Sequence, residues 1–323
     1  MRFRQAEGDA AFRGILYVFR DYDGVKMNSK QNLYKIWDIL KPFLIYYILH
    51  NVVFVLILSL CRMAAVRLGE EYLTYLGEHA QTVTGLVSGL SMIISVLPLI
   101  PWLRSELAAH HGDCARDVRR SSVQGEKKTE EEKCRRGFHN ATTAGLTVVF
   151  AASASMGLNI LFALTGLVEI SAEYQEVANR QYGVVFGVGI ILYGLISPIA
   201  EEIVFRGLIF NRMRRYYPHM AAVIVSGVVF GIYHGNPVQG LYGGCMGILM
   251  AYLYERRHSF AAPCLFHATA NTVVYAAAQS ARLQGQGAWI WREVYTPFGC
   301  VILLSIAAAC VVITERTGED KQN

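Results

Sequence analysis

Three short motifs in the second half of the chain combine ionisable side chains at a spacing of four residues. They are EEIVFR from Glu201 to Arg206, FGIYH from Phe230 to His234, and HATAN from His267 to Asn271. Residues four apart lie on one face of a helix, so the end members of each motif point the same way. A carboxylate and two imidazoles in apolar surroundings suit hydrolysis, because they can take a proton from water and stabilise an oxyanion.

The two adjacent glutamates are expected to have different roles. Successive helical residues are about 100° apart, so Glu201 and Glu202 must point in different directions. Glu202 stands four residues before Arg206 and can pair with it, whereas Glu201 has no such partner. We therefore predict a structural Glu202–Arg206 ion pair and a general base at Glu201.

The histidines and the asparagine complete the predicted chemistry. His234 is predicted to orient the water for Glu201, and His267 with Asn271 to donate hydrogen bonds to the developing oxyanion. Glu201, His234 and His267 are also a ligand set for zinc or another divalent metal that would activate the water. A bundle held together by these polar groups without any chemistry is the competing structural reading.

The elements that carry these motifs are predicted to be membrane helices. The mean hydropathy is +0.30, and only 17% of the residues are charged, against roughly 25% in soluble domains. A helix needs about 17–25 apolar residues to cross a bilayer. The sequence therefore predicts an all-α, polytopic transmembrane helix bundle with about eight spans, at residues 43–61, 82–102, 141–170, 183–201, 220–234, 239–254, 260–279 and 298–314.

The distribution of charge predicts how the bundle lies in the membrane. Cytoplasmic loops carry an excess of Lys and Arg, and every second loop of this chain is basic. We expect both termini inside the cell and a cell-membrane location. The predicted parts are a cytoplasmic N-terminal segment (1–39), two helices (40–103), a cytoplasmic polar loop (104–140), a catalytic bundle (141–315) and a cytoplasmic tail (316–323). The net charge of +5 is assigned to topology and anionic lipid headgroups, not to nucleic acid.

Helix rise predicts that the motif residues meet at one depth. At 1.5 Å per residue, Glu201 lies about 20 Å from Arg214 at the cytoplasmic surface, and His234, His267 and Asn271 lie about 15–24 Å from that surface. Water must reach this depth for hydrolysis. We therefore predict a cavity among the helices that carry the three motifs.

Small residues and prolines indicate how those helices pack. Pairs of glycines four apart allow close helix contact, and they occur at Gly183/Gly187, Gly227/Gly231, Gly240/Gly244 and Gly243/Gly247. Pro198 and Pro263 are expected to kink or loosen their helices and help to admit water.

Three other features are assigned no catalytic role. The seven cysteines show no pairing or metal-ligand spacing. Residues 104–140 read as a solvated, partly disordered linker, and the adjacent His110 and His111 as exposed side chains and not a metal site. No cleavable signal peptide is expected, and Met27 is an alternative start.

The three motifs, EExxxR, FxxxH and HxxxN, resemble those of the CAAX protease and bacteriocin-processing family, also called Abi, in order, spacing and helix placement. The likeness covers about residues 193–275, within a family core of about 183–280. It implies an intramembrane endopeptidase similar to CAAX prenyl protease 2, acting on a membrane-associated protein or peptide. The implied catalytic and supporting residues are Glu201, His234, His267 and Asn271, with Glu202, Arg206 and Phe230.

Two questions stay open at this point. The resemblance fits a glutamate peptidase or a metalloprotease, and Asn271 favours the first because an amide suits an oxyanion better than zinc. The alternative functions are a non-catalytic bacteriocin-immunity or binding membrane protein, and a proton-coupled transporter. A transporter predicts inverted repeats with broken helices in both halves, which this sequence does not show.

Overall fold

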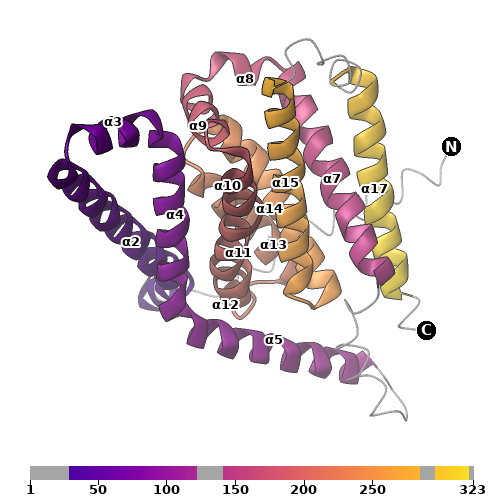
Figure 1. Cartoon of the computed structure of the whole chain (residues 1–323). Helices are drawn as coiled ribbons and strands as arrows, with labels where there is room; N and C mark the ends of the chain where they lie inside the picture. The colour runs from indigo at the N-terminus through magenta and orange to yellow at the C-terminus, as the bar shows by residue number, and fades with distance from the viewer. Residues whose placement is uncertain (1–28, 122–140, 284–294, 320–323) are drawn as a thin grey trace.

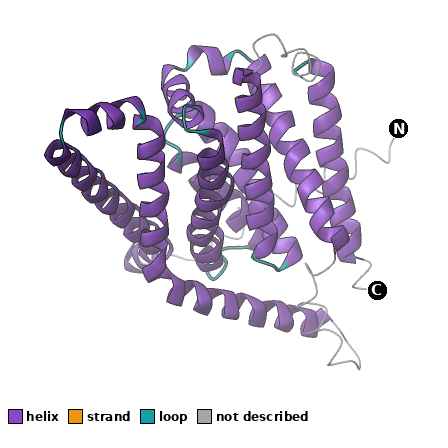
Figure 2. Cartoon of the chain, viewed as in Figure 1, coloured by secondary structure: helices purple, strands orange, loops and turns teal. Residues whose placement is uncertain are grey.

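The computed structural model describes residues 29–121, 141–283 and 295–319, and every regular element in these ranges is a helix (Figure 2). The predicted all-α fold is confirmed for this part of the chain, whereas Met27 and the last residues of the predicted tail lie outside it. In chain order the elements are α2 (Ser29–Leu68), α3 (Glu70–Glu78), α4 (Ala80–Val96), η1 (Leu97–Leu99), α5 (Ile100–Ser121), α7 (Ala141–Leu164), α8 (Leu167–Ile170), α9 (Ala172–Tyr182), α10 (Phe186–Ile191), η2 (Leu192–Ile196), α11 (Ser197–Glu202), η3 (Ile203–Phe210), α12 (Asn211–Met213), α13 (His219–Tyr233), α14 (Pro237–Arg257), α15 (Ala261–Leu283) and α17 (Pro297–Glu319).

The helices that carry the motifs stand at the centre of the molecule. In Figure 1, α10 to α15 are flanked by α7 and α17 on one side and by α2, α3 and α4 on the other. The long helix α5 lies across one end of this bundle, next to α12, whereas α8 and α9 lie at the opposite end. The motif residues therefore lie between two groups of flanking helices (Figure 1).

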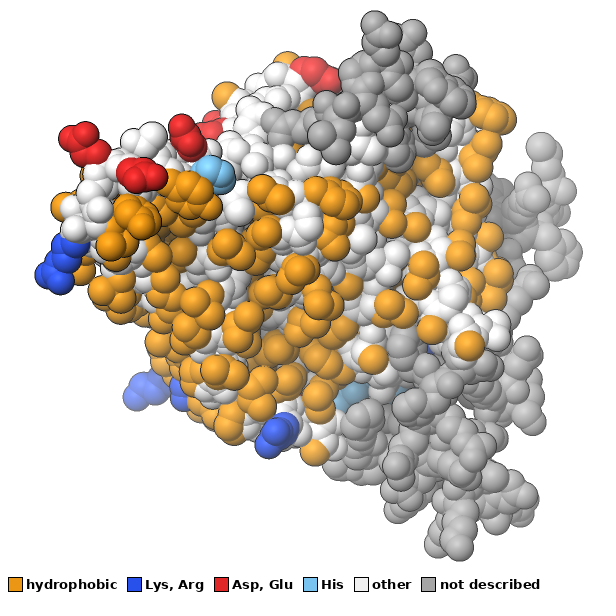
Figure 3. All heavy atoms as spheres, viewed as in Figure 1, with side chains coloured by type: hydrophobic (Ala, Val, Ile, Leu, Met, Phe, Trp, Pro, Cys, Tyr) orange, Lys and Arg blue, Asp and Glu red, His pale blue; other side chains and the backbone are white. Residues whose placement is uncertain are grey.

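The apolar character of the helices fits a membrane protein. Among the described residues, five helical stretches are long and apolar enough to cross a bilayer, and their bounds are Lys30–Leu68, Ala80–His110, Ala141–Leu164, Phe186–Met213 and Pro297–Thr314. Figure 3 shows hydrophobic side chains spread over the visible face, with acidic ones gathered along its upper edge. Each of the predicted spans overlaps helical residues, but α13 is shorter than the five long stretches, and α14 and α15 are not among them.

The third predicted span is divided by a turn. The sequence predicts one helix over residues 141–170, but α7 ends at Leu164 and the chain turns at Gly166, whose φ is 73°. This left-handed conformation is open to glycine without steric cost, and it commonly ends helices. The short helices α8 and α9 follow and cover that end of the bundle (Figure 1).

The prediction of a solvated linker is wrong for the first half of that segment. Residues 104–121 belong to α5, and the side chains of Glu106 and His110 are each only 4% exposed. Leu103, Glu106 and His110 recur at helical spacing, so they form one face that packs on the bundle. His110 is therefore not the exposed side chain that the sequence predicts. The His111 side chain and residues 122–140 lie outside the described part.

Glycines bring α13 and α14 into backbone contact, as the small-residue pairs predict. A Cβ atom added to Gly231 would stand 2.4 Å from the carbonyl oxygen of Gly240, and one added to Gly247 would stand 3.0 Å from Cα of Gly227. Side chains at these positions would force the helices apart. The Gly183/Gly187 pair does not join two helices in this way. A Cβ atom added to Gly183 would collide with the Gln81 side chain, whereas one added to Gly187 would have no neighbouring atom within 4 Å.

The helix that carries both glutamates is continuous but irregular. It runs from Phe186 to Met213 and contains two π-helical segments, η2 and η3, on either side of α11. Pro198 lies at the start of α11 and lacks an N–H group, so the helix is loosened there as predicted. Pro263 lies in the first turn of α15, where proline is tolerated, and it leaves that helix regular.

Candidate active site

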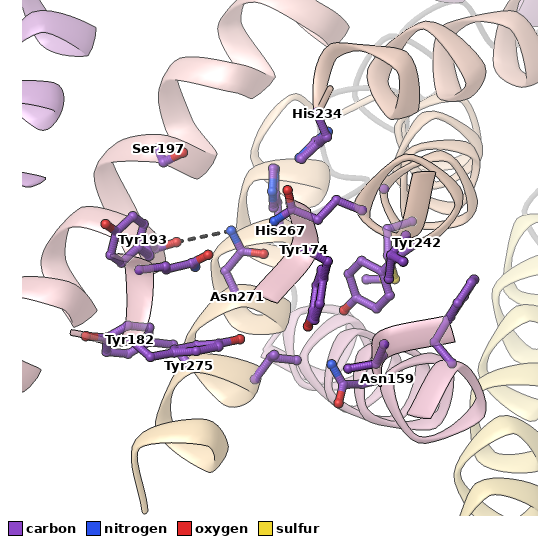
Figure 4. Close-up of a pocket in the computed structure, with 18 of the residues that line it drawn as sticks. Asn159, Tyr174, Tyr182, Tyr193, Ser197, His234, Tyr242, His267, Asn271 and Tyr275 are labelled. Atoms are coloured by element: carbon purple, nitrogen blue, oxygen red, sulfur yellow. Dashed lines mark hydrogen bonds between the residues drawn. The ribbon is translucent and has the colours of Figure 1, made fainter. Parts of the chain in front are cut away.

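The motif residues meet at one internal cavity. Glu201 from α11, His234 at the end of α13, and His267 and Asn271 from α15 all line a cavity of about 380 Å³. Figure 4 shows how His234, His267 and Asn271 lie around it. The helix-rise argument predicts this meeting, because it places the four side chains at similar depths. The other walls come from α7, α9 and α14, whose residues are distant in sequence.

One oxygen of Glu201 is anchored and the other faces an imidazole. The hydroxyl of Ser197 donates a hydrogen bond to Oε1 of Glu201 at 2.8 Å. The second oxygen, Oε2, lies 3.6 Å from Nε2 of His267, and the whole side chain is 7% exposed. Glu201 thus keeps one carboxylate oxygen available to the cavity, which is what a general base requires.

Glu202 and Arg206 form the predicted ion pair. Nη1 of Arg206 donates to Oε1 of Glu202 at 2.9 Å, and both side chains are fully buried. Nη2 of Arg206 donates to the carbonyl oxygen of Gly247 at 2.9 Å, and its guanidinium carbon lies 4.5 Å from the centre of the Phe230 ring. The pair therefore fixes α11 against α13 and α14.

Glu202 has a second partner that the sequence does not reveal. Its Oε1 atom also lies 2.8 Å from Nδ1 of His267, which is 65 positions away in the chain. A carboxylate paired with Arg206 only accepts hydrogen bonds, so Nδ1 of His267 carries the proton and donates it. Only Nε2 of His267 is then free to act at the cavity, which narrows the predicted role of this residue to one ring nitrogen.

His234 is held in a fixed orientation by its own helix. Nδ1 of His234 lies 2.8 Å from the carbonyl oxygen of Phe230, so Nδ1 is the protonated nitrogen and Nε2 is an acceptor. The ring also packs edge-on against the Phe230 ring, with centroids 4.8 Å apart. Gly243 lies beneath it, where a Cβ atom would stand 3.2 Å from Nδ1. Phe230 therefore supports His234 through its backbone and its ring.

Asn271 is anchored to the helix that carries Glu201. Its side-chain amide donates to the carbonyl oxygen of Tyr193 at 3.1 Å (Figure 4). Tyr193 and Ser197 both line the cavity and are absent from the three motifs. Ser197 stands four residues before Glu201, so the same spacing rule that finds the ion pair could have found it. Tyr193 acts through its backbone, and no side-chain pattern identifies such a contact.

The residues predicted as metal ligands do not form a ready-made ligand cluster. Within the described part of the chain, no group of three or more His, Cys, Asp and Glu side chains is placed to hold a metal ion. One nitrogen of His267 is already bonded to Glu202, and one oxygen of Glu201 is bonded to Ser197.

The fold and the site together define a helical membrane protein with an ionisable cluster in its interior. Residues 183–273 match the family described as Type II CAAX prenyl endopeptidase Rce1-like. The resemblance that the three motifs indicate is thus confirmed over this segment, which contains all the residues described above.

A curated relative matches over a longer stretch. The chain is 32% identical over 139 residues to YdiL of Bacillus subtilis (strain 168), which is described as a candidate membrane peptidase. The match covers 37% of this chain and 57% of YdiL, so it spans little more than half of the length of that relative. No solved structure matches the chain significantly.

Proposed function

We propose that the protein is an intramembrane endopeptidase of the CAAX prenyl protease type, and that Glu201 activates the hydrolytic water. The observation that carries this proposal is the position of Glu201, with one oxygen held by Ser197 and the other facing the cavity beside His267. A buried carboxylate with only one oxygen hydrogen-bonded destabilises a helix bundle. Such a group is explained if its second oxygen accepts a proton during catalysis.

The first step forms a bond between water and the substrate. Oε2 of Glu201 takes a proton from the water while Nε2 of His234 accepts the other hydrogen bond and aims the oxygen. The water oxygen attacks the carbonyl carbon of the scissile peptide bond. The carbonyl electrons move onto the oxygen, which becomes an oxyanion.

The second step breaks the carbon–nitrogen bond. The oxyanion accepts hydrogen bonds from Nε2 of His267, in its protonated form, and from the side-chain amide of Asn271. Glu202 balances the positive charge of the His267 imidazolium through its hydrogen bond with Nδ1. When the oxyanion collapses, Glu201 returns its proton to the departing amine. The products are a carboxylic acid and an amine, and the side chains regain their starting protonation states.

The proposal includes a placement in the cell membrane. We infer about eight spans with both termini in the cytoplasm, because α13, α14 and α15 add three helices to the five long apolar stretches and because every second loop of the chain is basic. The substrate is then a membrane-associated protein or peptide, and the second partner is the lipid bilayer. Nucleic acid is not an expected partner.

A cleavage assay with one pair of matched variants tests the function. Glu201→Gln keeps the shape of the side chain but removes its basicity, and we expect cleavage of a fluorescence-quenched peptide library to fall about 100-fold or more. The matched control is Glu169→Gln, the same change at a residue of α8 that does not line the cavity. Cleavage by the Glu201→Gln variant at the wild-type rate would contradict the proposal.

The same assay separates the alternatives. Cleavage that stops with a chelator and returns with zinc would assign Glu201, His234 and His267 as metal ligands. A protein that binds peptides from the library without cleaving them would be a binding or immunity protein. We expect cleavage that a chelator does not change.

A further inference from the structure

Helix α2 packs on the glutamate helix in a register that two contacts fix. At one end of the contact, Nη1 of Arg212 donates to the backbone oxygen of Asp38 at 2.7 Å. About two turns away, the ring centres of Phe43 and Phe205 lie 6.0 Å apart. Residue numbers rise along α2 as they fall along the glutamate helix, so the two helices run in opposite directions. Tyr46, about one turn further along α2, therefore comes level with the predicted general base.

The side chain of Tyr46 is buried although its neighbours on α2 are exposed. Tyr46 is 0% exposed, whereas Tyr47 and Ile48 are 49% and 58% exposed. Its ring stacks on the ring of His50, with centroids 5.9 Å apart. A phenol hydroxyl is costly to bury unless polar groups lie near it, so the surroundings of this hydroxyl indicate its role.

The polar neighbours of the Tyr46 hydroxyl are a second phenol and the general base. The hydroxyls of Tyr46 and Tyr233 interact with each other, and both interact electrostatically with the carboxylate of Glu201. The Tyr233 ring is held by Phe43 and Phe205, with centroid distances of 5.8 and 5.2 Å. Each phenol carries one hydroxyl proton. When one proton is shared between the two phenols, the other can be donated to the carboxylate.

The two tyrosines can influence the reaction only through Glu201. Neither of them lines the cavity, so neither contacts a substrate there. A general base must be ionised before it can take a proton from water, whereas burial favours the neutral form of a carboxyl group. A hydroxyl that donates toward a carboxylate favours the ionised form and also limits the directions in which the carboxylate can turn.

We propose that Tyr46, together with Tyr233, is a positioning residue that keeps Glu201 ionised and directed toward the cavity. The proposal rests on the proposed peptidase function and adds α2 to the active site. Helix α2 lies outside residues 183–273, the segment that matches the family. The general base of this chain thus depends on a helix beyond that segment.

A hydroxyl deletion tests the role of Tyr46 in turnover. Tyr46→Phe keeps the ring, and we expect kcat for the quenched peptides to fall about tenfold while KM stays within about twofold. The matched control is Tyr254→Phe, because Tyr254 is equally buried but its hydroxyl bonds to Asn211 and it does not line the cavity. The control should keep kcat within about twofold. Equal falls in kcat would indicate general loosening and would overturn the proposal.

Combined variants test whether Tyr46 acts through Glu201. In a Glu201→Gln background, Tyr46→Phe should change the residual rate by less than about twofold, because the group that the hydroxyl supports is already absent. A tenfold fall in both backgrounds would contradict the proposal. Tyr233→Phe should resemble Tyr46→Phe, and the double variant should lose less than the product of the two single effects.

A chemical probe tests the same link without using activity. Dicyclohexylcarbodiimide is an apolar reagent that modifies carboxyl groups in their protonated form, and peptide mass spectrometry measures its addition to Glu201. At neutral pH, Tyr46→Phe should raise the rate of this modification at least about threefold, whereas Tyr254→Phe should leave it unchanged. His267 and Arg206 also interact with Glu201, and both are present in every one of these variants. Equal rates in the wild type and Tyr46→Phe would overturn the proposal.

The two readouts together separate this inference from the proposed chemistry. Faster modification in Tyr46→Phe, combined with wild-type cleavage by Glu201→Gln, would contradict the peptidase mechanism and keep the link between the tyrosine and the carboxylate. Loss of cleavage in Glu201→Gln, combined with unchanged kcat and unchanged modification in Tyr46→Phe, would overturn the inference and leave the mechanism standing.

Discussion

Two ionic clusters, one buried and one partly buried, lie within about four turns of each other along and just beyond the glutamate helix, and they differ in which atoms they leave free. We define the cavity cluster as Glu201, Glu202, Arg206, His234 and His267, and the clamp cluster as Asp38, Glu106, Arg212, Arg215 and Tyr216. All members of the cavity cluster except Glu202 and Arg206 line the cavity, whereas no member of the clamp cluster does. Both clusters place charge inside the protein, but only one places it against open space.

The clamp cluster joins three separate elements. Nε of Arg212 donates to Oε1 of Glu106 on α5 at 3.1 Å, and Nη1 donates to the backbone oxygen of Asp38 on α2 at 2.7 Å. Arg215 also pairs with Glu106, and the hydroxyl of Tyr216 donates to Oδ2 of Asp38 at 2.9 Å. Each carboxylate here has more than one donor. These residues hold α2 and α5 against the end of the glutamate helix.

The difference shows which observation identifies a site. Both clusters contain buried charged groups, so burial alone does not distinguish an active site from a structural clamp. The distinguishing feature is an acceptor atom that faces a cavity, as Oε2 of Glu201 and Nε2 of His234 do. The following changes separate the two clusters, from the largest expected effect to the smallest.

Removal of Arg206 should have the largest effect, and it acts on stability. Arg206→Ala leaves Glu202 as a fully buried carboxylate, and we expect a loss of roughly 3–5 kcal/mol in the free energy of unfolding. Arg212→Ala is the matched change in the clamp cluster, and it should cost less because Arg215 still pairs with Glu106. Denaturant unfolding in detergent measures both. Equal losses would remove the distinction between the two clusters.

Neutralising one glutamate in each cluster should lower activity in the cavity cluster and leave it nearly unchanged in the clamp cluster. Glu201→Gln should lower turnover about 100-fold or more, because an amide cannot accept the proton of the water. Glu106→Gln should keep turnover, per folded molecule, within about twofold, because Glu106 acts only on packing. A loss of turnover in Glu106→Gln as large as in Glu201→Gln would mean that the clamp cluster takes part in the chemistry.

Ser197→Ala should have a moderate effect on activity. The change frees Oε1 of Glu201, so the carboxylate loses the bond that fixes its direction, and we expect a fall in kcat of about tenfold with little change in KM. Ser91→Ala is the control, because the hydroxyl of this buried serine bonds only to the backbone oxygen of Val87 in α4. A fall in kcat of equal size in both variants would indicate general loosening of the bundle.

Tyr216→Phe should have the smallest effect. It removes one hydrogen bond to Asp38 and should lower the free energy of unfolding by about 0.5–1.5 kcal/mol. Turnover of the folded enzyme should not change, because Tyr216 does not line the cavity. Loss of turnover without loss of stability would contradict the division into two clusters.

Spacing along the chain predicts the local contacts of the site but not the distant ones. The Glu202–Arg206 pair follows from the four-residue rule, and Ser197 follows from the same rule applied backward from Glu201. The bond from His267 to Glu202 does not, because it depends on how α15 packs on α11.

The fold shows the same limit. Hydrophobic runs predict where the long helices lie, and glycine pairs predict the contact of α13 with α14. Helix α5 is missed because its sequence is polar, and the arginines that satisfy Glu106 come from a segment about 100 positions later. A polar segment reads as solvated until its partners are known.

Because α13 and α14 are in backbone contact, the wall of the cavity that they form is stiffer than the wall formed by α8 and α9. Two helices that touch through Gly231 and Gly240 cannot slide or separate without losing that fit, so they move as a single body that carries His234. Across the cavity, α8 and α9 are short and follow the turn at Gly166. Widening of the cavity therefore falls to the wall without reacting groups, while the hydrogen bond from Arg206 to the carbonyl oxygen of Gly247 holds the helix of Glu201 against the pair that carries His234.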